Sequence, residues 1–387
     1  MATIPITKPV QRRKYLEQLP RNLTTWTHET VASAISLQTQ GDWSNSSLLG
    51  VQMMTDGRFA ADLQKLVLGL VRITPVAKPV NEDNPQEILA AKLIQDNWHL
   101  MFPESTLIQW LRFYHLVDCG PGIIEWQYNN SMWLPVVKVF NPANTRYQHF
   151  RLSDGESPWV HMTQGGLINF TPGDGRWVLL TDWFPGVPLG LVSQLGLGWV
   201  DKQIARADRA DITKQIANPK YKAITPAGEK DVQVRSAWLD DIVASDQTSI
   251  IECPQEPDGS GYDVIVIPVS RDGFEMTGEA ITEANADYAV SILGSSVASE
   301  LGAVGSRAAV ETYRGVGREL IEAHAAVLST VIREQVLKHF VAKNVGPTVE
   351  VPWLTWEVPV DGQSDEQAKK DVTSNEDSID NAAKKTI

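Results

Sequence analysis

Cysteine is scarce in this chain, since Cys119 and Cys253 are the only two among 387 residues. Two cysteines build no disulfide framework, and the sequence contains no CxxC pair, so we expect synthesis in a reducing cytoplasm. Residues 1–20 lack the apolar stretch that a signal peptide has. No run of about 18 apolar residues occurs, and we therefore expect no membrane-spanning helix.

The chain also has fewer basic than acidic residues. The chain has 34 Lys and Arg against 47 Asp and Glu, which gives a formal net charge of -13. A protein that grips nucleic acid tightly needs many basic side chains to displace counterions, so this composition argues against such a surface. An acidic wall that lets DNA slide past is compatible with the charge, and so is an ordinary acidic protein that its charge keeps soluble.

The motifs of common enzymes are missing. The sequence contains no GxxxxGK[ST] loop, no HExxH and no GxSxG, and no GxGxxG follows a predicted strand. His324 and His339 are too far apart on one predicted helix to share a metal, so we interpret both as structural. Asp240 and Asp241 are neighbours that point in different directions on a helix, which favours solvated charge. We expect no catalytic residue, no cofactor and no metal.

The composition is typical of a folded protein, with 43% hydrophobic and 21% charged residues. Its 13 tryptophans are unusual. Trp98, Trp110, Trp126 and Trp133 lie in apolar patterns, which favours roles in the core or at a subunit interface. Stacking on nucleic-acid bases is the alternative.

Apolar periodicity organises the first half of the chain. Spacings of three and four predict an amphipathic helix over 51–72, after a loop at 43–50. Prolines indicate a linker at 74–85. Asn129-Asn130 between two apolar runs indicates a β-hairpin. The predicted elements are helices at 51–72, 86–101 and 107–116, and strands at 123–128, 133–139, 165–170 and 176–180.

The pattern changes after Pro188. A helix is predicted at 189–217, and Asn218-Pro219 ends it. A mixed block follows at 220–272, and a second helix is predicted at 273–293. Within the block we predict a helix at 237–244 and strands at 249–252 and 262–269. Residues 294–307 are rich in small side chains and are predicted to be irregular. The last predicted elements are a helix at 308–344 with a kink near Gly315 and Gly317, a strand at 349–358 and a polar tail at 361–387.

Several short motifs occur in a recognisable order. They are Asp118-Cys119-Gly120, Ile124-Glu125-Trp126, Ile292-Leu293-Gly294, Gly305-Ser306-Arg307-Ala308 and Asn344, together with the helix at 48–62. In this order they resemble the portal proteins of Mu-like tailed bacteriophages, and the likeness spans most of residues 45–345. The motifs are short and tolerant, so their order carries more weight than any single one.

The resemblance implies an α+β portal fold, with copies of the chain, twelve by analogy, closing into a ring. The crown of the fold would be reduced or absent, since few residues follow the last predicted strand. The implied parts are an N-terminal wing at 1–188, a first stem helix at 189–217, a clip at 218–272, a second stem helix at 273–293, a tunnel loop at 294–307, a long helix with a C-terminal wing strand at 308–358, and a flexible tail or vestigial crown at 359–387.

The tunnel loop would face DNA in the channel of the ring. Its glycines permit movement, and its small side chains offer no bulk that would jam against DNA. Arg307 either touches phosphate or merely opens a helix that Ser306 caps. The candidate channel residues are Ser295, Ser296, Ser299, Glu300, Gly302, Gly305, Ser306 and Arg307.

The clip would face outward and dock partners. By resemblance these are the large subunit of terminase during packaging and a head–tail adaptor afterwards. The major capsid protein and double-stranded DNA, passing without sequence specificity, are the other implied partners, and no membrane is among them. The implied location is the portal vertex of the virion. The candidate clip residues are Lys220, Lys222, Lys230, Arg235, Trp238, Asp240 and Asp241.

Two alternatives remain. An enzyme built on residues 86–180 would require a pocket with clustered titratable groups, and the sequence offers no such cluster. Another virion structural protein, such as a minor head protein or head–tail connector, would leave the helix–block–helix order of 189–293 unexplained.

Overall fold

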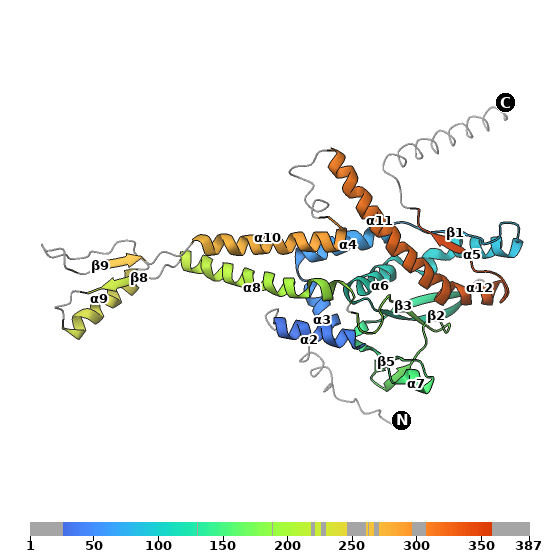
Figure 1. The fold of residues 1–387 in the computed structure, drawn as a ribbon, viewed down its shortest axis with the longest axis horizontal. Coiled ribbons are helices and arrows are strands. Elements are labelled where there is room, and N and C mark those ends of the chain that lie inside the picture. Colours follow the sequence, from blue (N-terminus) through green and yellow to red (C-terminus); the bar gives the residue numbers. More distant parts are fainter. Residues whose placement is uncertain are drawn as a thin grey trace, which may run out of the picture. The chain divides into compact units, whose positions relative to one another are not determined.

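The computed structural model describes residues 26–129, 131–187, 189–217, 221–225, 230–245, 261, 263–266, 271–295 and 307–357 (Figure 1). The chain forms two compact units. Met1–Val200 and Asn285–Ile387 make up the larger unit, and Asp201–Ala284 makes up the smaller one. Both contain helices and strands, so the prediction of a mixed α and β protein is confirmed.

The larger unit begins with a series of helices: α2 (His28–Thr39), α3 (Ser44–Met53), α4 (Gly57–Val71), α5 (Pro85–Met101) and α6 (Glu104–Val117). The predictions for α5 and α6 are confirmed. The loop predicted at 43–50 is wrong, because α3 occupies it. The single helix predicted at 51–72 is broken where Asp56 accepts hydrogen bonds from the backbone N–H groups of Arg58 and Phe59 and thereby caps α4.

A three-stranded antiparallel sheet packs against α6. Its order is β3 (Met132–Val139), β2 (Gly120–Asn129) and β7 (Trp177–Leu180), which confirms the predicted hairpin and the strand at 176–180. The turn lies one residue later than predicted, since Asn129 pairs with Met132 and Ser131 has a φ of 62°. Trp110 Nε1 donates to the carbonyl of Gly120 at 2.6 Å. A Cβ on Gly120 would lie 2.6 Å from Trp110 Cδ1, so only glycine fits there.

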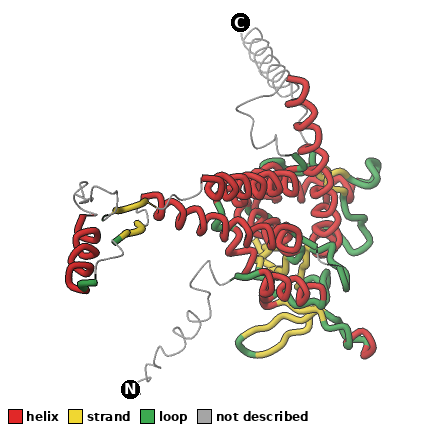
Figure 2. The backbone as a smooth tube through the Cα atoms, turned by 60° about the vertical axis from the view of Figure 1, so that its left-hand side comes forward, coloured by secondary structure: helices red, strands yellow, loops and turns green. Residues whose placement is uncertain are grey.

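A second antiparallel sheet contains β4 (Thr145–Tyr147), β5 (Trp159–Thr163) and β6 (Gly166–Asn169), in that order. It follows the short 3-10 helix η2 (Pro142–Asn144), and α7 (Arg151–Asp154) lies between β4 and β5. The strand predicted at 165–170 is confirmed as β6, while β4 and β5 were not expected. Figure 2 shows the hairpin of β5 and β6 (yellow) projecting from the larger unit.

Tryptophan packing joins this second sheet to the helices. The ring of Trp43 lies 5.6 Å from that of Trp159 and 4.9 Å from that of Trp183. Trp98 and Trp110 are buried, as the prediction of core positions requires. Trp133 is 40% exposed, so it does not belong to the core, and its other predicted role, at a subunit interface, stays a prediction. It lies near the turn of the β2–β3 hairpin and packs on Tyr128 with ring centroids 5.1 Å apart.

The C-terminal part of the larger unit contains α11 (Arg307–Ile332), the π-helix η4 (Arg333–Leu337) and α12 (Lys338–Asn344). The helix predicted at 308–344 therefore forms. Its distortion lies at η4 and not at Gly315 and Gly317, which belong to the regular α11. A π-turn inserts one extra residue, and here it brings Gln335 to the free edge of β7. Leu179 N–H donates to Gln335 Oε1 at 2.8 Å, and Gln335 Nε2 donates to Leu179 O at 3.1 Å.

The last strand pairs far back along the chain. β10 (Trp353–Thr355) is antiparallel to β1 (Val76–Lys78), with Ala77 opposite Leu354. The strand predicted at 349–358 is thus shorter than expected. The linker predicted at 74–85 contains the strand β1. The neighbouring prolines leave backbone groups of this segment without local partners, and pairing with β10 satisfies them. The tail predicted at 361–387 lies outside the described residues.

The smaller unit contains the C-terminal part of α8 (Leu191–Ala217), β8 (Tyr221–Ile224), α9 (Val232–Ser245), β9 (Asp263–Val266) and the N-terminal part of α10 (Arg271–Leu293). The helices predicted at 189–217, 237–244 and 273–293 form, and β8 was not expected. β8 and β9 are antiparallel. The guanidinium of Arg209 on α8 lies 4.1 Å from the ring centroid of Phe274 on α10, which holds these helix ends together. The strand predicted at 249–252 lies outside the described residues.

None of the helices that the structure describes is both long enough and apolar enough to cross a bilayer.

Replacement of Gln335 by leucine tests the link between η4 and β7. Gln335→Leu leaves the buried N–H and C=O of Leu179 unpaired, so the free energy of unfolding should fall by about 2–4 kcal/mol. Chemical denaturation of the full chain measures this change. Glu334→Gln, at the exposed neighbouring position, is the control and should change stability by less than about 0.5 kcal/mol. Equal stability of both variants would contradict the role assigned to Gln335.

Candidate functional site

A cavity of about 360 Å³ lies within the larger unit. It is bounded by the end of α6, the residues after β7, the start of α8, the end of α10 and the middle of α11. Its apolar lining comes from Leu66, Leu189, Leu191, Ile292 and Leu320. Its polar lining comes from Tyr114, His115, Asp118, Asp182, Gln194, Ser291 and His324.

Two carboxylates meet in this cavity because α6 ends abruptly. Asp118 follows the last turn of α6 with a φ of 50°, a left-handed conformation that turns the chain into β2. Its Oδ1 accepts the backbone N–H of Asp182 at 3.0 Å. The Tyr114 hydroxyl donates to Asp182 Oδ2 at 2.6 Å. Backbone turns at the ends of α6 and β7 thus place Asp118 and Asp182 side by side.

Two imidazoles complete the polar wall. His115 lies on the last turn of α6 and His324 lies on α11, with ring centroids 4.5 Å apart and the rings nearly perpendicular. The structural interpretation of His324 stays a prediction, and its neighbour is a residue that the sequence did not suggest. His339 lies elsewhere and contacts the carbonyl of Gly173 at 2.9 Å. Among the described residues, no cluster of three His, Cys, Asp or Glu side chains could hold a metal ion.

Burial controls the protonation of this cluster. It lowers the pKa of His115 to about 3, with a further contribution from His324, and it also lowers the pKa of His324. Burial raises the pKa of Asp118 to about 7, and the charge of Asp182 adds to this rise. The pKa of Tyr114 is raised by burial and by its hydrogen bond to Asp182. Burial thus favours the uncharged form of both imidazoles and the protonated form of Asp118.

One oxygen of the cluster lacks a partner. Asp118 is 4% exposed, and its Oδ2 is buried without a hydrogen bond. Among the described residues that line the cavity there is no lysine or arginine to balance the charge of Asp118. A buried carboxylate oxygen without a donor is costly.

The predicted tunnel-loop residues are described only at their ends. Gly294, with a φ of 73°, follows α10, and Ser295 behind it is buried. Arg307 begins α11, but its side chain is not described, so the choice between a phosphate contact and a helix end stays open. The predicted residues outside the described ranges are Ser296, Ser299, Glu300, Gly302, Gly305 and Ser306.

The predicted clip residues fall mainly on α9. Arg235 and Asp240 on this helix are exposed, Trp238 is partly buried, and Lys230 is exposed just before the helix. The remaining three give less information: Lys222 lies in β8 and Asp241 in α9 with side chains that are not described, and Lys220 lies outside the described residues.

A second surface is apolar and combines side chains of the projecting hairpin with side chains of α7 and of the residue before it. We define the hairpin surface as Phe150, Leu152, Met162, Leu167 and Ile168, each of which is between 40% and 63% exposed. β6 is an edge strand that pairs with β5 alone among the described strands. Because Leu167 and Ile168 are adjacent, they point to opposite faces of β6, and both faces are uncovered.

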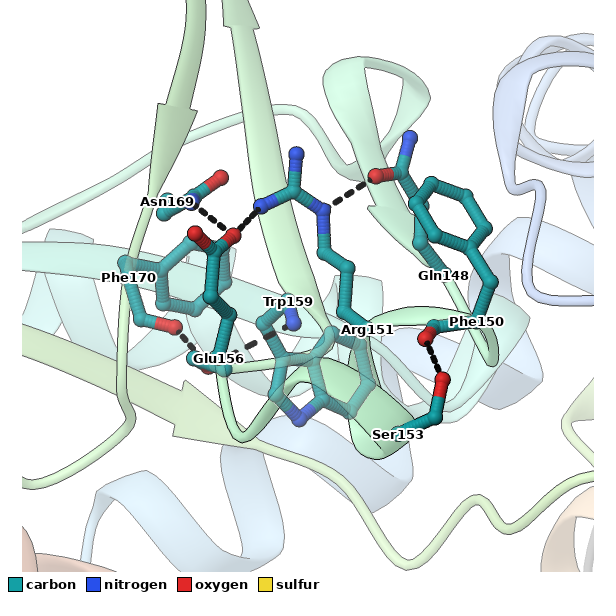
Figure 3. A network of polar contacts seen from close by, with 9 residues as sticks. Gln148, Phe150, Arg151, Ser153, Glu156, Trp159, Asn169 and Phe170 are labelled. Carbon is teal, nitrogen blue, oxygen red and sulfur yellow. Dashed lines mark hydrogen bonds and ion pairs between the residues drawn. The ribbon is translucent and has the colours of Figure 1, made fainter.

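A polar network makes this surface rigid (Figure 3). Arg151 on α7 donates from Nε to Gln148 Oε1 at 2.6 Å and pairs through Nη1 with Glu156 at 2.5 Å. Glu156 also accepts from Asn169 Nδ2 at 3.2 Å. The network therefore fastens α7 to the end of β6.

The chain matches a known family over most of its length. Residues 49–380 match the family described as the portal protein of Mu bacteriophage. The chain belongs to this family. The resemblance stated from the sequence is thereby confirmed. No curated protein matches the chain in sequence.

Solved structures resemble this portal-family chain at low sequence identity. A chain in the neck of an empty gene transfer agent particle is 13% identical, with 83% of this chain and 87% of that chain covered and a TM-score of 0.55. A chain in the neck of a native particle, computed with C12 symmetry, is 10% identical, with 89% of each chain covered and a TM-score of 0.53. An HK97-family phage portal protein from Corynebacterium diphtheriae is 10% identical with a TM-score of 0.48, covering 80% of this chain and 94% of that one. The first two likenesses show a shared fold.

The cluster in the cavity was missed from the sequence of this portal-family chain. Its members come from three distant segments, namely 114–118, Asp182 and His324, so no local spacing reveals them. One signal was available, because Asp118-Cys119-Gly120 was already noted as a motif. An acidic residue between a predicted helix and a predicted strand indicates a helix end. The side chain of such a residue often accepts a hydrogen bond from nearby backbone groups.

The raised pKa of Asp118 makes stability depend on pH. The folded state binds a proton more tightly than the unfolded state, whose pKa is near 3.8, so stability falls as pH rises from about 4 to about 7. Asp118→Asn removes this loss and suits the left-handed backbone. Between about pH 5 and about pH 8, the variant should therefore gain roughly 2–3 kcal/mol relative to the parent.

Denaturant unfolding at both pH values measures this difference. The opposite dependence of His115, whose lowered pKa costs stability as pH falls below about 6.5, is common to both proteins and cancels. Asp96→Asn, on the exposed side of α5, is the matched control and should show no such trend. A parallel pH dependence in parent and Asp118→Asn would show that Asp118 is ionised normally.

Proposed function

We propose that twelve copies of this chain form a ring at one capsid vertex, through which DNA is packaged and ejected. The observation that carries this proposal is the match of residues 49–380 to the Mu portal family. The fold shared with a neck chain in a particle computed with C12 symmetry supports the number twelve. The protein would be made in the host cytoplasm and would reside at the portal vertex of the virion. Its role would be structural and not enzymatic.

The parts of the ring follow from the order of elements. We propose α8 and α10 as the stem helices and the block at 218–272, with β8, α9 and β9, as the clip. The supporting observation is that both helices contribute an end to a smaller unit that is compact by itself. The remaining assignments are a wing at 1–188, a tunnel loop at 294–307, a long helix and wing strand at 308–358, and a tail or vestigial crown at 359–387.

The channel would touch DNA weakly. A net charge of -13 per copy repels phosphate, so the ring would let the double helix slide without sequence specificity. The tunnel loop would line the narrowest part. Gly294 with its positive φ supports a sharp exit from α10 at this point.

The clip would dock the large subunit of terminase and later the head–tail adaptor, while the wing would contact the major capsid protein. Exposed side chains of both signs on and beside α9, namely Lys230, Arg235 and Asp240, support a surface that meets protein partners. A minor head or connector protein is the alternative, and it predicts no ring of this chain alone.

The hairpin surface would be one side of the contact between copies. In a closed ring each subunit offers two different complementary patches. An edge strand with apolar side chains on both faces is otherwise a liability that soluble proteins avoid, so a second copy is the occupant that a ring requires. The rigid network around Arg151 supports this assignment, because a fixed surface binds with little loss of entropy.

Ring formation is the decisive test. Electron microscopy of the purified full chain should show annuli with a central hole. Leu167→Asp and Ile168→Asp should each weaken assembly at least about tenfold, since a charge would be buried in the contact. Sedimentation and mass photometry measure the fraction assembled.

The control is the same change at an exposed leucine elsewhere, Leu100→Asp on α5. All variants should keep the parent's circular dichroism spectrum. A parent that stays monomeric under all salt conditions would overturn the ring, whereas normal rings of Leu167→Asp and Ile168→Asp would overturn only the hairpin surface as the contact.

A further inference from the structure

Two carboxamide side chains occupy the edges of the sheet formed by β3, β2 and β7. Gln335 bonds the backbone N–H and C=O of Leu179 on β7. On the opposite edge, Asn344 Oδ1 accepts the N–H of Trp133 on β3 at 2.7 Å, and Asn344 Nδ2 donates to the carbonyl of Trp133 at 2.9 Å. Each amide takes the place that a further strand would occupy at that point.

Other short strands of the larger unit have occupied edges too. Gln95 Oε1 accepts the N–H of Ala77 on β1 at 3.0 Å. Ser329 Oγ donates to the carbonyl of Leu354 on β10 at 2.9 Å. On β4, the N–H of Tyr147 donates to a loop carbonyl at 2.8 Å. Each of these edges thus has at least one backbone group engaged by a side chain or a loop.

β6 has no such contact among the described residues. The N–H of Phe170 donates to the carbonyl of Trp159 at 3.1 Å, which fixes the alternation along the antiparallel ladder of β5 and β6. The backbone groups of Ile168 therefore face β5, and those of Leu167 and Asn169 face outward. The described residues supply no partner for these two outward N–H and two outward C=O groups. This edge is open to a further strand.

The sequence before the first described residue contains a segment that suits such an edge. Residues 3–9 read TIPITKP, with Pro5 and Pro9 four positions apart. In an extended chain, alternate residues direct their backbone groups to opposite sides, so both prolines would face the same side. The N–H groups of Ile4 and Ile6 would face the other side. Such a strand pairs along one edge only, which suits the last strand of a sheet.

We propose that residues 3–9 of a neighbouring copy add to β6 as a strand, an inference that rests on the proposed contact between copies. The backbone groups of Ile4 and Ile6 bond the four outward groups of β6, and their side chains lie on the same face as Leu167. A closed ring needs two different complementary patches, and this segment supplies the second one. Residues 10–25 span roughly 50 Å when extended, which exceeds the roughly 30 Å diameter of a small domain.

Charge favours the same contact. Residues 1–14 carry four basic side chains and no acidic one, whereas the whole chain has a net charge of -13. Asp154 and Glu156, next to the network that fastens α7 to β6, are exposed. The acidic body of one copy therefore attracts the basic segment of another, and this attraction speeds their encounter.

Disulfide trapping in the full chain tests the contact. One protein carries Ile6→Cys, a second protein with a different tag carries Leu167→Cys, and the two are mixed and mildly oxidised. We expect a disulfide between the two chains, and peptide mapping by mass spectrometry distinguishes it from links to the native cysteines. Ile4→Cys covers a register shifted by two residues. Leu100→Cys, at an exposed leucine on α5, is the matched control for Leu167→Cys and should not link.

Proline substitution tests the backbone pairing itself. Ile6→Pro removes an N–H that faces β6 in the proposed strand, so ring assembly should weaken at least about tenfold. Thr7→Pro removes an N–H that faces away, and this matched control should assemble like the parent. Ile6→Ala keeps the N–H and should weaken assembly less than Ile6→Pro. Mass photometry measures the assembled fraction, and circular dichroism spectra like that of the parent establish that the variants fold.

The proposal and the proposed function fail on different results. Normal rings that form no link, or that tolerate Ile6→Pro as well as Thr7→Pro, would overturn the added strand and leave the ring standing. Links between chains that close no ring would sink the proposed function and leave the strand contact. A double variant with Ile6→Cys and Leu167→Cys that links only within single chains would assign the segment to its own copy and overturn the proposal.

Discussion

The carbonyl group of Val117 is the point on which the larger unit depends. It lies at the end of α6, where the last carbonyls have no partner within the helix. Gln38 Nε2 from α2 and Trp43 Nε1 each donate to it at 3.0 Å. Gln38 Nε2 also donates to the carbonyl of Leu189 at 2.6 Å. One buried glutamine thus fixes the end of α6 and the entry into α8 together.

This junction leaves no room for ordinary side chains. Gly190 has a φ of 90°, and a Cβ there would lie 2.7 Å from the carbonyl oxygen of Leu116. Residues 189–190 lie close to the end of α6 and cover Asp118. The left-handed backbone of Asp118 directs its side chain inward. The raised pKa of Asp118 is therefore a consequence of how α6 ends, and the protein tolerates the cost because the same junction stabilises three helices.

Local patterns predicted the elements that neighbouring residues determine. The amphipathic stripe of α4, the β2–β3 hairpin and the long helices α8 and α10 were all visible in the sequence. The break between α3 and α4 could have been predicted too, because Asp56-Gly57 is a helix-start signal that the apolar stripe masked. Pattern alone failed at β1, whose pairing with β10 depends on residues far away in the chain. The same limit hid the contact of His115 with His324.

The end of α10 connects the cavity to the segment that the portal interpretation places at the channel. Ser291 and Ile292 line the cavity, and Gly294 ends the helix just beyond them with a positive φ. Ser295, the first residue after this turn, is buried. Asp118 in the wall of the same cavity is buried too, so salt screens its charge much less than it screens the exposed charges of this acidic chain.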